Sequence, residues 1–272
     1  MTITPQQMQA LETQLNGFDH LLVAFSGGVD STLLLAEAVR LLGKDRVIAL
    51  TALSPTLPAQ EQQEAQALAQ QIGATSIMEP THEMNNPAFT ANGPDRCYHC
   101  KTTLFDLCDQ ILAKQDDPQQ WAIAYGANLD DLGDHRPGMD AARERGIYAP
   151  LLQAKWGKDL IRARSHQLGL PTADKAAMAC LSSRFPTHTP ITLTHLNRVE
   201  KAENLLRKAG FKLFRVRFEG NRARIELGQE ELYRLDEELV QTELVQAIKH
   251  CGFEQVYLDP KGYRTGGANT PH

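Results

Sequence analysis

The sequence predicts an α/β protein with a mainly parallel sheet, followed by a second, smaller α+β domain. Short apolar segments alternate with longer amphipathic ones up to about residue 186, and a glycine-rich turn joins the first apolar segment to a helix. After residue 186 the order of elements becomes helix, strand, strand, helix, strand. Strands that alternate with helices favour a parallel sheet covered on both faces, and such sheets bind ligands beyond the carboxyl ends of their strands. We therefore expect domains at residues 1–186 and 187–272.

Each expected element follows from local hydrophobic periodicity. In the first domain, short apolar runs predict strands at residues 20–25, 47–52, 75–78 and 121–125. Longer segments predict helices at residues 30–42, 58–72, 98–113 and 157–168. In the second domain we expect helices at residues 192–209 and about 230–250, and strands at residues 212–218, 222–227 and 256–258. Residues 172–190 contain three prolines and few apolar residues, which predicts a functional loop or linker.

Composition narrows the function classes. The 272 residues are 42% hydrophobic and 22% charged, as in ordinary soluble globular proteins. The net charge of −5 argues against a chain that binds nucleic acid over its whole surface, although a local basic pocket stays possible. No apolar run approaches the ~20 residues of a membrane span, and the N-terminus lacks the pattern of a signal peptide, so we expect a cytoplasmic protein with no membrane partner. Five cysteines in the cytoplasm favour metal or redox chemistry over structural disulfides.

The glycine-rich turn is the sequence SGGVDS at residues 26–31. Its two glycines let the backbone approach a ligand, and free N–H groups at a helix start attract phosphate. Ser26 and Ser31 add hydroxyl donors, and Asp30 could hold Mg²⁺ against the phosphates. It is not a Walker A loop, because no Gly-Lys-Ser/Thr follows. The alternative is a tight turn in which Asp30 and Ser31 only cap the helix.

SGGVDS after a strand resembles the PP-loop of the ATP pyrophosphatases, which bind ATP, transfer AMP to an oxygen of their substrate and release pyrophosphate. Seven further segments extend the similarity over nearly the whole chain. They are RCYHCK at 96–101, GANLDD at 126–131, DHRPG at 134–138, CLSSRFP at 180–186, RVRF at 215–218, ARIE at 223–226 and GYRTG at 262–266. Together they resemble the LarE family of ATP-dependent pyridinium-3,5-biscarboxylic acid mononucleotide sulfurtransferases. Those enzymes build the thiolated ligand of the nickel-pincer cofactor of lactate racemase.

This resemblance implies an adenine nucleotide alpha hydrolase fold in the first domain, with the second serving substrate binding, oligomerisation or both. It implies adenylylation of a substrate carboxylate, then replacement of AMP by sulfur to give a thiocarboxylate. The implied partners are a small nucleotide substrate, inorganic sulfide or another sulfur donor, and further copies of the chain in a homo-oligomer. The implied ATP site comprises Ala24, Ser26, Gly27, Gly28, Asp30, Ser31 and Gly126, and the implied substrate site comprises Ser183, Arg184, Arg215, Arg217 and Glu226.

The cysteines distinguish two branches of that family. One branch supplies sulfur from its own cysteine, five residues before the arginine of the SSRFP stretch, and lacks a Cys-x-x-Cys. Here that position is Ala179, a cysteine follows at Cys180, and a Cys-x-x-Cys is present at Cys97 and Cys100. Both differences resemble the branch in which three cysteines hold a 4Fe–4S cluster, and thiolates are the soft ligands that such clusters prefer. We therefore expect Cys97, Cys100 and Cys180 to be metal ligands that act in catalysis with Asp30.

Other interpretations of the cysteines stay open. Zinc would need a fourth ligand, which His99 or His188 could supply. Cys180 could instead be a sacrificial sulfur donor, or Cys97 and Cys100 a redox pair or two unlinked thiols. Cys108 falls on an apolar helical stripe and is expected in the core, and Cys251 is expected to be structural.

The charged candidates also have two interpretations each. Arg215 and Arg217 alternate along one strand and face the same side, either as a clamp for carboxylate or phosphate or as a solvated face. Glu226 is a partner for these arginines or a metal ligand. The aspartates of the GANLDD and DHRPG segments are Mg²⁺ ligands or a solvated acidic turn; they are Asp130, Asp131 and Asp134.

Two other functions compete with sulfur transfer to a small nucleotide. A PP-loop tRNA thiolation enzyme could use a similar cluster, although its usual RNA-binding domain and basic surface are not evident in this sequence. A non-catalytic protein that binds ATP or senses a cluster is the third alternative.

Overall fold

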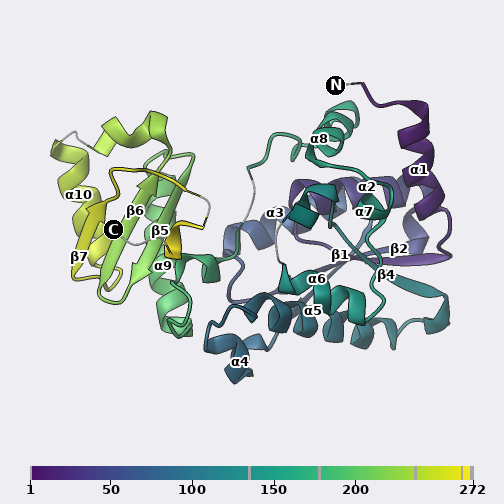
Figure 1. Cartoon of the computed structure of the whole chain (residues 1–272), viewed down its shortest axis with the longest axis horizontal. Coiled ribbons are helices and arrows are strands. Elements are labelled where there is room, and N and C mark those ends of the chain that lie inside the picture. The colour runs from purple at the N-terminus through teal and green to yellow at the C-terminus, as the bar shows by residue number, and fades with distance from the viewer. Residues whose placement is uncertain (1, 134–135, 177–178, 236–237, 265, 270–272) are drawn as a thin grey trace. The chain divides into compact units, whose positions relative to one another are not determined.

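The computed structural model describes residues 2–133, 136–176, 179–235, 238–264 and 266–269 (Figure 1). Asp134, His135 and Thr265 of the family-like segments lie outside the described residues. The chain forms two compact units. Unit 1 comprises Met1–Glu83 and Asp95–Met178, and unit 2 comprises Met84–Pro94 and Ala179–His272.

Unit 1 is built on a four-stranded parallel sheet in the order β3-β2-β1-β4, which confirms the predicted fold class. Its strands are β1 (His20–Ala24), β2 (Val47–Leu53), β3 (Thr75–Pro80) and β4 (Trp121–Tyr125). β1 pairs with β2 on one side and with β4 on the other, so the strand order reverses between β1 and β4. In sheets of this kind the ligand site lies beyond the carboxyl ends of the strands at that reversal.

Helices cover both faces of this sheet (Figure 1). Successive residues of β1 point to opposite faces, so Leu21 and Val23 enter one core while Leu22 and Ala24 enter the other. The first core is shared with α1 (Pro5–Leu15), α2 (Val29–Leu42), α3 (Ala59–Ile72), α7 (Pro150–Gln153) and α8 (Lys158–Gln167). The second core is shared with α5 (Arg96–Leu112) and α6 (Pro137–Glu144).

Unit 2 contains a three-stranded sheet in the order β5-β6-β7. β5 (Phe214–Glu219) and β6 (Arg222–Leu227) are antiparallel, whereas β6 and β7 (Gln255–Leu258) are parallel. The helices of this unit are α4 (Pro87–Thr90), α9 (Leu193–Lys208) and α10 (Glu238–Lys249). The apolar face of α9, with Leu196 and Val199, packs with Val216 of β5 and Ile225 of β6 in one core.

The boundary of unit 2 differs from the one expected at residue 186 because its core reaches further back along the chain. Leu181 and Phe185 are buried in that core, so the segment expected as a linker belongs largely to unit 2. Residues 84–94 join the same unit through backbone hydrogen bonds from His188 to Asn92 at 2.9 Å and from Ile191 to Thr90 at 2.8 Å. The functional roles expected for the two parts stay predictions.

Several elements differ from expectation, among them the short helices α4, α6 and α7, which the sequence analysis did not expect. The segment expected as one helix at residues 230–250 is a 3₁₀ turn at Gln229–Leu235 followed by α10, with residues 236–237 outside the description. Helix α1 was not expected, although Thr4 and Gln7 form a capping box at its start. In the part of the chain that the structure describes, no helix is both long and apolar enough to cross a membrane.

Candidate active site

The phosphate loop follows β1 at the carboxyl edge of the unit 1 sheet. The Phe25 N–H donates to the Leu50 carbonyl at 2.8 Å, which extends the β1–β2 pairing to the start of the loop. Gly27 has a φ of +70°, and a Cβ there would lie 3.1 Å from the Cβ of Ala65 in α3. Backbone conformation and limited space therefore both favour glycine at this position. Gly28 is the N-cap of α2 and has no side chain to satisfy the first N–H groups of that helix.

The two serines of the loop contact each other. The Ser26 and Ser31 hydroxyl oxygens lie 3.1 Å apart, and the Ser31 hydroxyl donates to the Gly28 carbonyl at 3.2 Å. Gly126, the residue after β4, lies against the start of α2. A Cβ on Gly126 would be 2.8 Å from the Ser31 backbone nitrogen. The residues expected to bind ATP therefore lie together in unit 1 where the strand order reverses; they are Ala24, Ser26, Gly27, Gly28, Asp30, Ser31 and Gly126.

Asp30 forms an ion pair with Lys158, the first residue of α8. This pair uses Oδ2 of the carboxylate, whereas Oδ1 is buried and has no hydrogen-bond partner in the described part of the chain. A buried carboxylate oxygen without a partner at a helix start fits the role of Mg²⁺ ligand expected for Asp30. No sequence motif marks Lys158, so the sequence analysis did not identify it.

A second lysine missing from the expected site contacts the same loop. The Lys175 ammonium lies 2.7 Å from Glu61, 2.8 Å from Glu64 and 3.4 Å from the Gly27 carbonyl oxygen. Burial opposes the charge of Lys175, but the hydrogen bonds to Glu61 and Glu64 leave its pKa above the usual value. Lys175 therefore stays charged and connects the loop to α3.

The aspartates that follow β4 stabilise local structure. Asp131 accepts a hydrogen bond from the Asn128 N–H at 3.0 Å and pairs with Arg136. Asp130 accepts from the Lys158 N–H at 2.6 Å, at the first turn of α8. These contacts favour the structural interpretation of both residues over Mg²⁺ binding, whereas Asp134 lies outside the described residues.

Cys97 and Cys100 lie in the first turns of α5, in unit 1. Cys97 is exposed and Cys100 is partly buried, while His99 between them is 3.1 Å from the Asp95 carboxylate. Cys180 lies in unit 2, at the N-cap of the short 3₁₀ helix Leu181–Arg184, and is partly buried.

None of the five cysteines forms a disulfide. The donor chemistry of the three candidates fits an iron–sulfur cluster, because thiolates are its preferred ligands. Among the residues that the structure describes, no group of three or more His, Cys, Asp or Glu side chains is placed to hold a metal ion. The shared ligand set therefore stays a proposal.

The other two cysteines have structural surroundings. Cys108 is fully buried on the face of α5 that packs on the sheet, and burial raises the pKa of its thiol to about 12. The Cys251 thiol donates to the Ala247 carbonyl at 3.5 Å at the end of α10. Both environments fit the structural roles expected from the sequence.

Arg184 organises the loop that contains Cys180. The residue is only 3% exposed, and its guanidinium binds Glu203 of α9 through two hydrogen bonds, of 2.8 Å and 3.0 Å. Its remaining nitrogen donates to the carbonyls of Ala179 at 2.7 Å and Cys180 at 3.0 Å and to the Ser183 hydroxyl at 2.9 Å. Arg184 therefore fixes the backbone on which Cys180 and Ser183 lie.

Arg217 and Glu226 belong to a buried ionic network between β5 and β6. Arg217 donates to Glu226 at 2.9 Å and to the Ser183 carbonyl at 2.9 Å. Glu226 is fully buried and also accepts from Arg224 at 2.8 Å, and Arg224 in turn contacts Asp259 at 2.8 Å. These contacts favour the pairing role for Glu226 over metal binding.

Arg215 is more accessible than its neighbours Arg184 and Arg217. Its guanidinium lies 5.1 Å from the centre of the Tyr263 ring. Burial and the adjacent Arg184 charge lower its pKa below the ordinary arginine value. An anion bound beside Arg215 would relieve this crowding of positive charge, so Arg215 has the best geometry of the three arginines for substrate contact.

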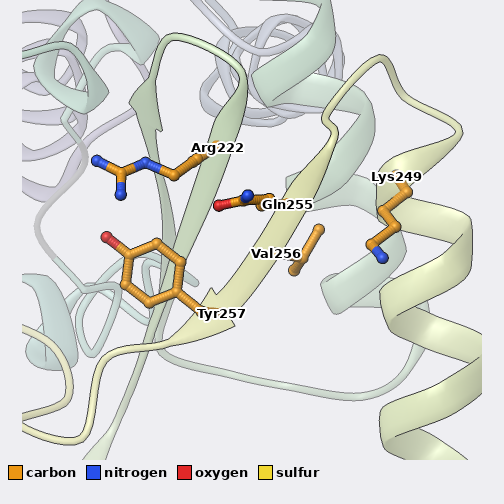
Figure 2. Close-up of a pocket in the computed structure, with 5 residues that line it drawn as sticks. All are labelled: Arg222, Lys249, Gln255, Val256 and Tyr257. Atoms are coloured by element: carbon orange, nitrogen blue, oxygen red, sulfur yellow. The ribbon is translucent and has the colours of Figure 1, made fainter.

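A separate pocket lies on the β6–β7 side of unit 2 (Figure 2). It is lined by Arg222, Lys249, Gln255, Val256 and Tyr257. None of the expected site residues lines it. The Tyr257 hydroxyl donates to Glu219 at 2.6 Å, so this pocket lies outside the expected site and is stabilised by its own contacts.

Sequence comparisons identify relatives over the whole chain. The NAD synthase family matches residues 6–95, the region of the phosphate loop. An uncharacterised protein of Synechocystis sp. is 43% identical over 268 residues, which is 97% of each chain. The pyridinium-3,5-bisthiocarboxylic acid mononucleotide synthase of Lactiplantibacillus plantarum is 35% identical over 260 residues, covering 95% of this chain and 92% of that protein. This chain belongs to the LarE family.

Membership in the LarE family, together with the match to NAD synthase, identifies an ATP-using enzyme of the PP-loop class. A third relative, an uncharacterised protein of Methanocaldococcus jannaschii, is 27% identical over 252 residues. The phosphate loop of this LarE protein follows a buried strand and opens a helix, as the PP-loop interpretation requires. Its iron–sulfur branch within the family is not established by these relatives.

Proposed function

We propose that this LarE protein transfers sulfur to a carboxylate of a pyridinium biscarboxylate mononucleotide and so makes the thiocarboxylate of a nickel-pincer cofactor. The observation that carries the proposal is the phosphate loop, in which Gly27 lies close to α3 and Asp30 has a buried oxygen without a partner among the described residues. The name of the Lactiplantibacillus plantarum relative supports the substrate class.

The first reaction step is adenylylation. ATP phosphates bind the N–H groups at the start of α2, and Asp30 supplies a carboxylate oxygen to the accompanying Mg²⁺. A carboxylate oxygen of the substrate attacks the α-phosphorus, and the bond from the α-phosphorus to the bridging oxygen breaks. Pyrophosphate leaves with that bonding pair, and the substrate becomes an acyl adenylate.

The second step is the transfer of sulfur. A sulfide nucleophile attacks the acyl carbon, the bond from carbon to the AMP oxygen breaks, and AMP leaves with the bonding pair. The products are a thiocarboxylate and AMP, without any net oxidation or reduction.

We further propose that Cys97, Cys100 and Cys180 ligate a 4Fe–4S cluster. With three protein ligands, such a cluster would offer one open iron where a free sulfide could bind. The exposure of Cys97 and the partial exposure of Cys100 and Cys180 support this assignment, because none of the three residues is buried in a core. Arg184 contributes by fixing the backbone carbonyl of Cys180.

Anaerobic purification with iron and sulfide analysis tests the cluster. We expect Cys97→Ala, Cys100→Ala and Cys180→Ala each to lose iron and sulfur transfer but to retain substrate-dependent exchange of pyrophosphate into ATP. Cys108→Ala and Cys251→Ala are the matched controls and should keep the wild-type iron content. Iron-free protein that converts Cys180 to dehydroalanine in one turnover would instead establish a sacrificial mechanism and refute the cluster.

A further inference from the structure

Lys101 is a partly buried cation that the phosphate chemistry described above does not use. It follows Cys100 in α5, and its ammonium lies 5.9 Å from the Phe105 ring centre and 5.7 Å from the Tyr125 ring centre. Within the described part of the chain, no carboxylate forms an ion pair with it. Two aromatic faces stabilise the charge only partly, since such contacts contribute about 0.5–2 kcal/mol. An anionic ligand would complete the environment of this ammonium.

The position of Lys101 relates it to the nucleotide site of unit 1. Tyr125 is the last residue of β4 and pairs with Ala24 of β1, immediately before the phosphate loop. The next residue, Gly126, contacts the start of α2 at Ser31. The ammonium therefore lies at the carboxyl edge of the sheet where the strand order reverses, on the face covered by α5. The phosphate loop leads into α2, which covers the opposite face.

The aliphatic stem of Lys101 is fixed in place. A Cβ on Gly138, at the start of α6, would lie 2.9 Å from the Lys101 Cγ, so the stem passes directly against the α6 backbone. An ammonium on a packed stem is pre-organised, which lowers the entropic cost of binding an anion.

We infer that Lys101 binds the substrate carboxylate that attacks the α-phosphorus of ATP. This inference rests on the proposed function and deepens it. The proposed phosphate site has its own donors on the α2 side, in the helix N–H groups and the hydroxyls of Ser26 and Ser31, and Lys158 is paired with Asp30 there. Lys101 lies at the same edge of the sheet on the face covered by α5, and we place the second reactant there, across the edge from the phosphates. It binds one carboxylate oxygen and orients the other toward phosphorus.

Replacing Lys101 with Met tests the inference, because Met preserves the packed stem and removes the charge. The matched control is Lys114→Met, at an exposed lysine just beyond the end of α5. We would measure the Kd of a non-hydrolysable ATP analogue, and kcat and KM for the pyridinium substrate in pyrophosphate exchange. Losing a charged hydrogen-bond partner corresponds to roughly a ten- to hundredfold effect.

For Lys101→Met we expect the substrate KM to rise by about tenfold or more while the Kd of the ATP analogue changes by less than about twofold. Lys101→Arg should recover most of the loss, because it restores the cation, and Lys114→Met should resemble wild type. An unchanged substrate KM in Lys101→Met, or an equal loss of affinity for the ATP analogue, would overturn the role of Lys101. Wild-type protein without carboxylate-dependent exchange would overturn the proposed function itself, before any variant is compared.

Discussion

A Cβ on Gly126 would lie 2.8 Å from the backbone nitrogen of Ser31. At this point the chain just after β4 lies directly against the backbone at the start of α2. The neighbouring atoms are all backbone atoms, so no flexible side chain could move aside. The start of α2, the proposed phosphate site, is thus positioned by the strand on the other side of the order reversal.

Gly126→Ala should therefore reduce nucleotide binding. The added methyl group must displace the first turn of α2, which shifts the N–H groups away from the phosphates. We expect the Kd of an ATP analogue, measured by calorimetry, to rise by about tenfold or more, because a small misplacement at such a site is costly. Gly133→Ala is the control, since nothing lies within 4 Å of its Cβ position. Wild-type affinity in Gly126→Ala would show that the helix start does not bind the nucleotide.

Asp30→Asn preserves the size of the side chain and removes its charge. We expect pyrophosphate exchange to fall by about 100-fold or more, as for the loss of other groups that stabilise developing charge, because an amide is a poor Mg²⁺ ligand. Circular dichroism should show an intact fold. Asp140→Asn, where the carboxylate pairs with an exposed arginine, should retain activity. Normal exchange in Asp30→Asn would exclude a metal role for this residue.

Glu203→Ala should destabilise unit 2 around the Cys180 loop. Removing one partner from a buried ion pair typically costs about 3–5 kcal/mol, since Arg184 is left charged and unpaired. Glu203 also accepts a hydrogen bond from the Val216 N–H at 3.1 Å. We therefore expect faster hydrogen exchange in peptides that contain Val216. Asn197→Ala, at an exposed position of α9, is the control, and unchanged exchange at Val216 would contradict the structural role of Glu203.

Arg215→Met and Arg217→Met should have different effects, although the two arginines alternate on one strand. Arg217 is 3% exposed and paired with Glu226, so its loss should chiefly lower the melting temperature. Arg215 is more accessible and lies in a crowded cationic environment, so its loss should raise the substrate Kd by roughly 10–100-fold with little change in the melting temperature. Measuring the substrate Kd and the melting temperature of both variants tests this difference. If the two variants changed both quantities to the same extent, the assignment would be contradicted.

The parallel sheet and the phosphate loop were predictable because short stretches of sequence determine them. A buried apolar run, two glycines and a helix start lie within about a dozen consecutive residues, so local periodicity was sufficient. Lys158 and Lys175 could not be predicted in this way. They lie 128 and 148 residues beyond their partners in the loop, and only the packed fold brings each pair together.

The substrate arginines illustrate the same limit. Alternation correctly predicted that Arg215 and Arg217 share a face, but it gives no information about which side chains lie opposite. Register places Glu226 across from Arg215 and Arg224 across from Arg217, and α9 places Glu203 against Arg184. Part of the positive charge that was expected to bind the substrate is therefore neutralised by carboxylates within unit 2.

The short segment Met84–Pro94 has a consequence for how the chain is made. It belongs to unit 2, yet the ribosome synthesises it between the two halves of unit 1 and well before the rest of unit 2 begins at Ala179. Met84, which packs against the buried core of unit 2 in the finished protein, therefore emerges before the residues that form that core. Domains generally fold as units during synthesis, so unit 2 cannot complete its core until the C-terminal third of the chain has appeared. A nascent chain stalled between these points would leave Met84 without the core against which it packs.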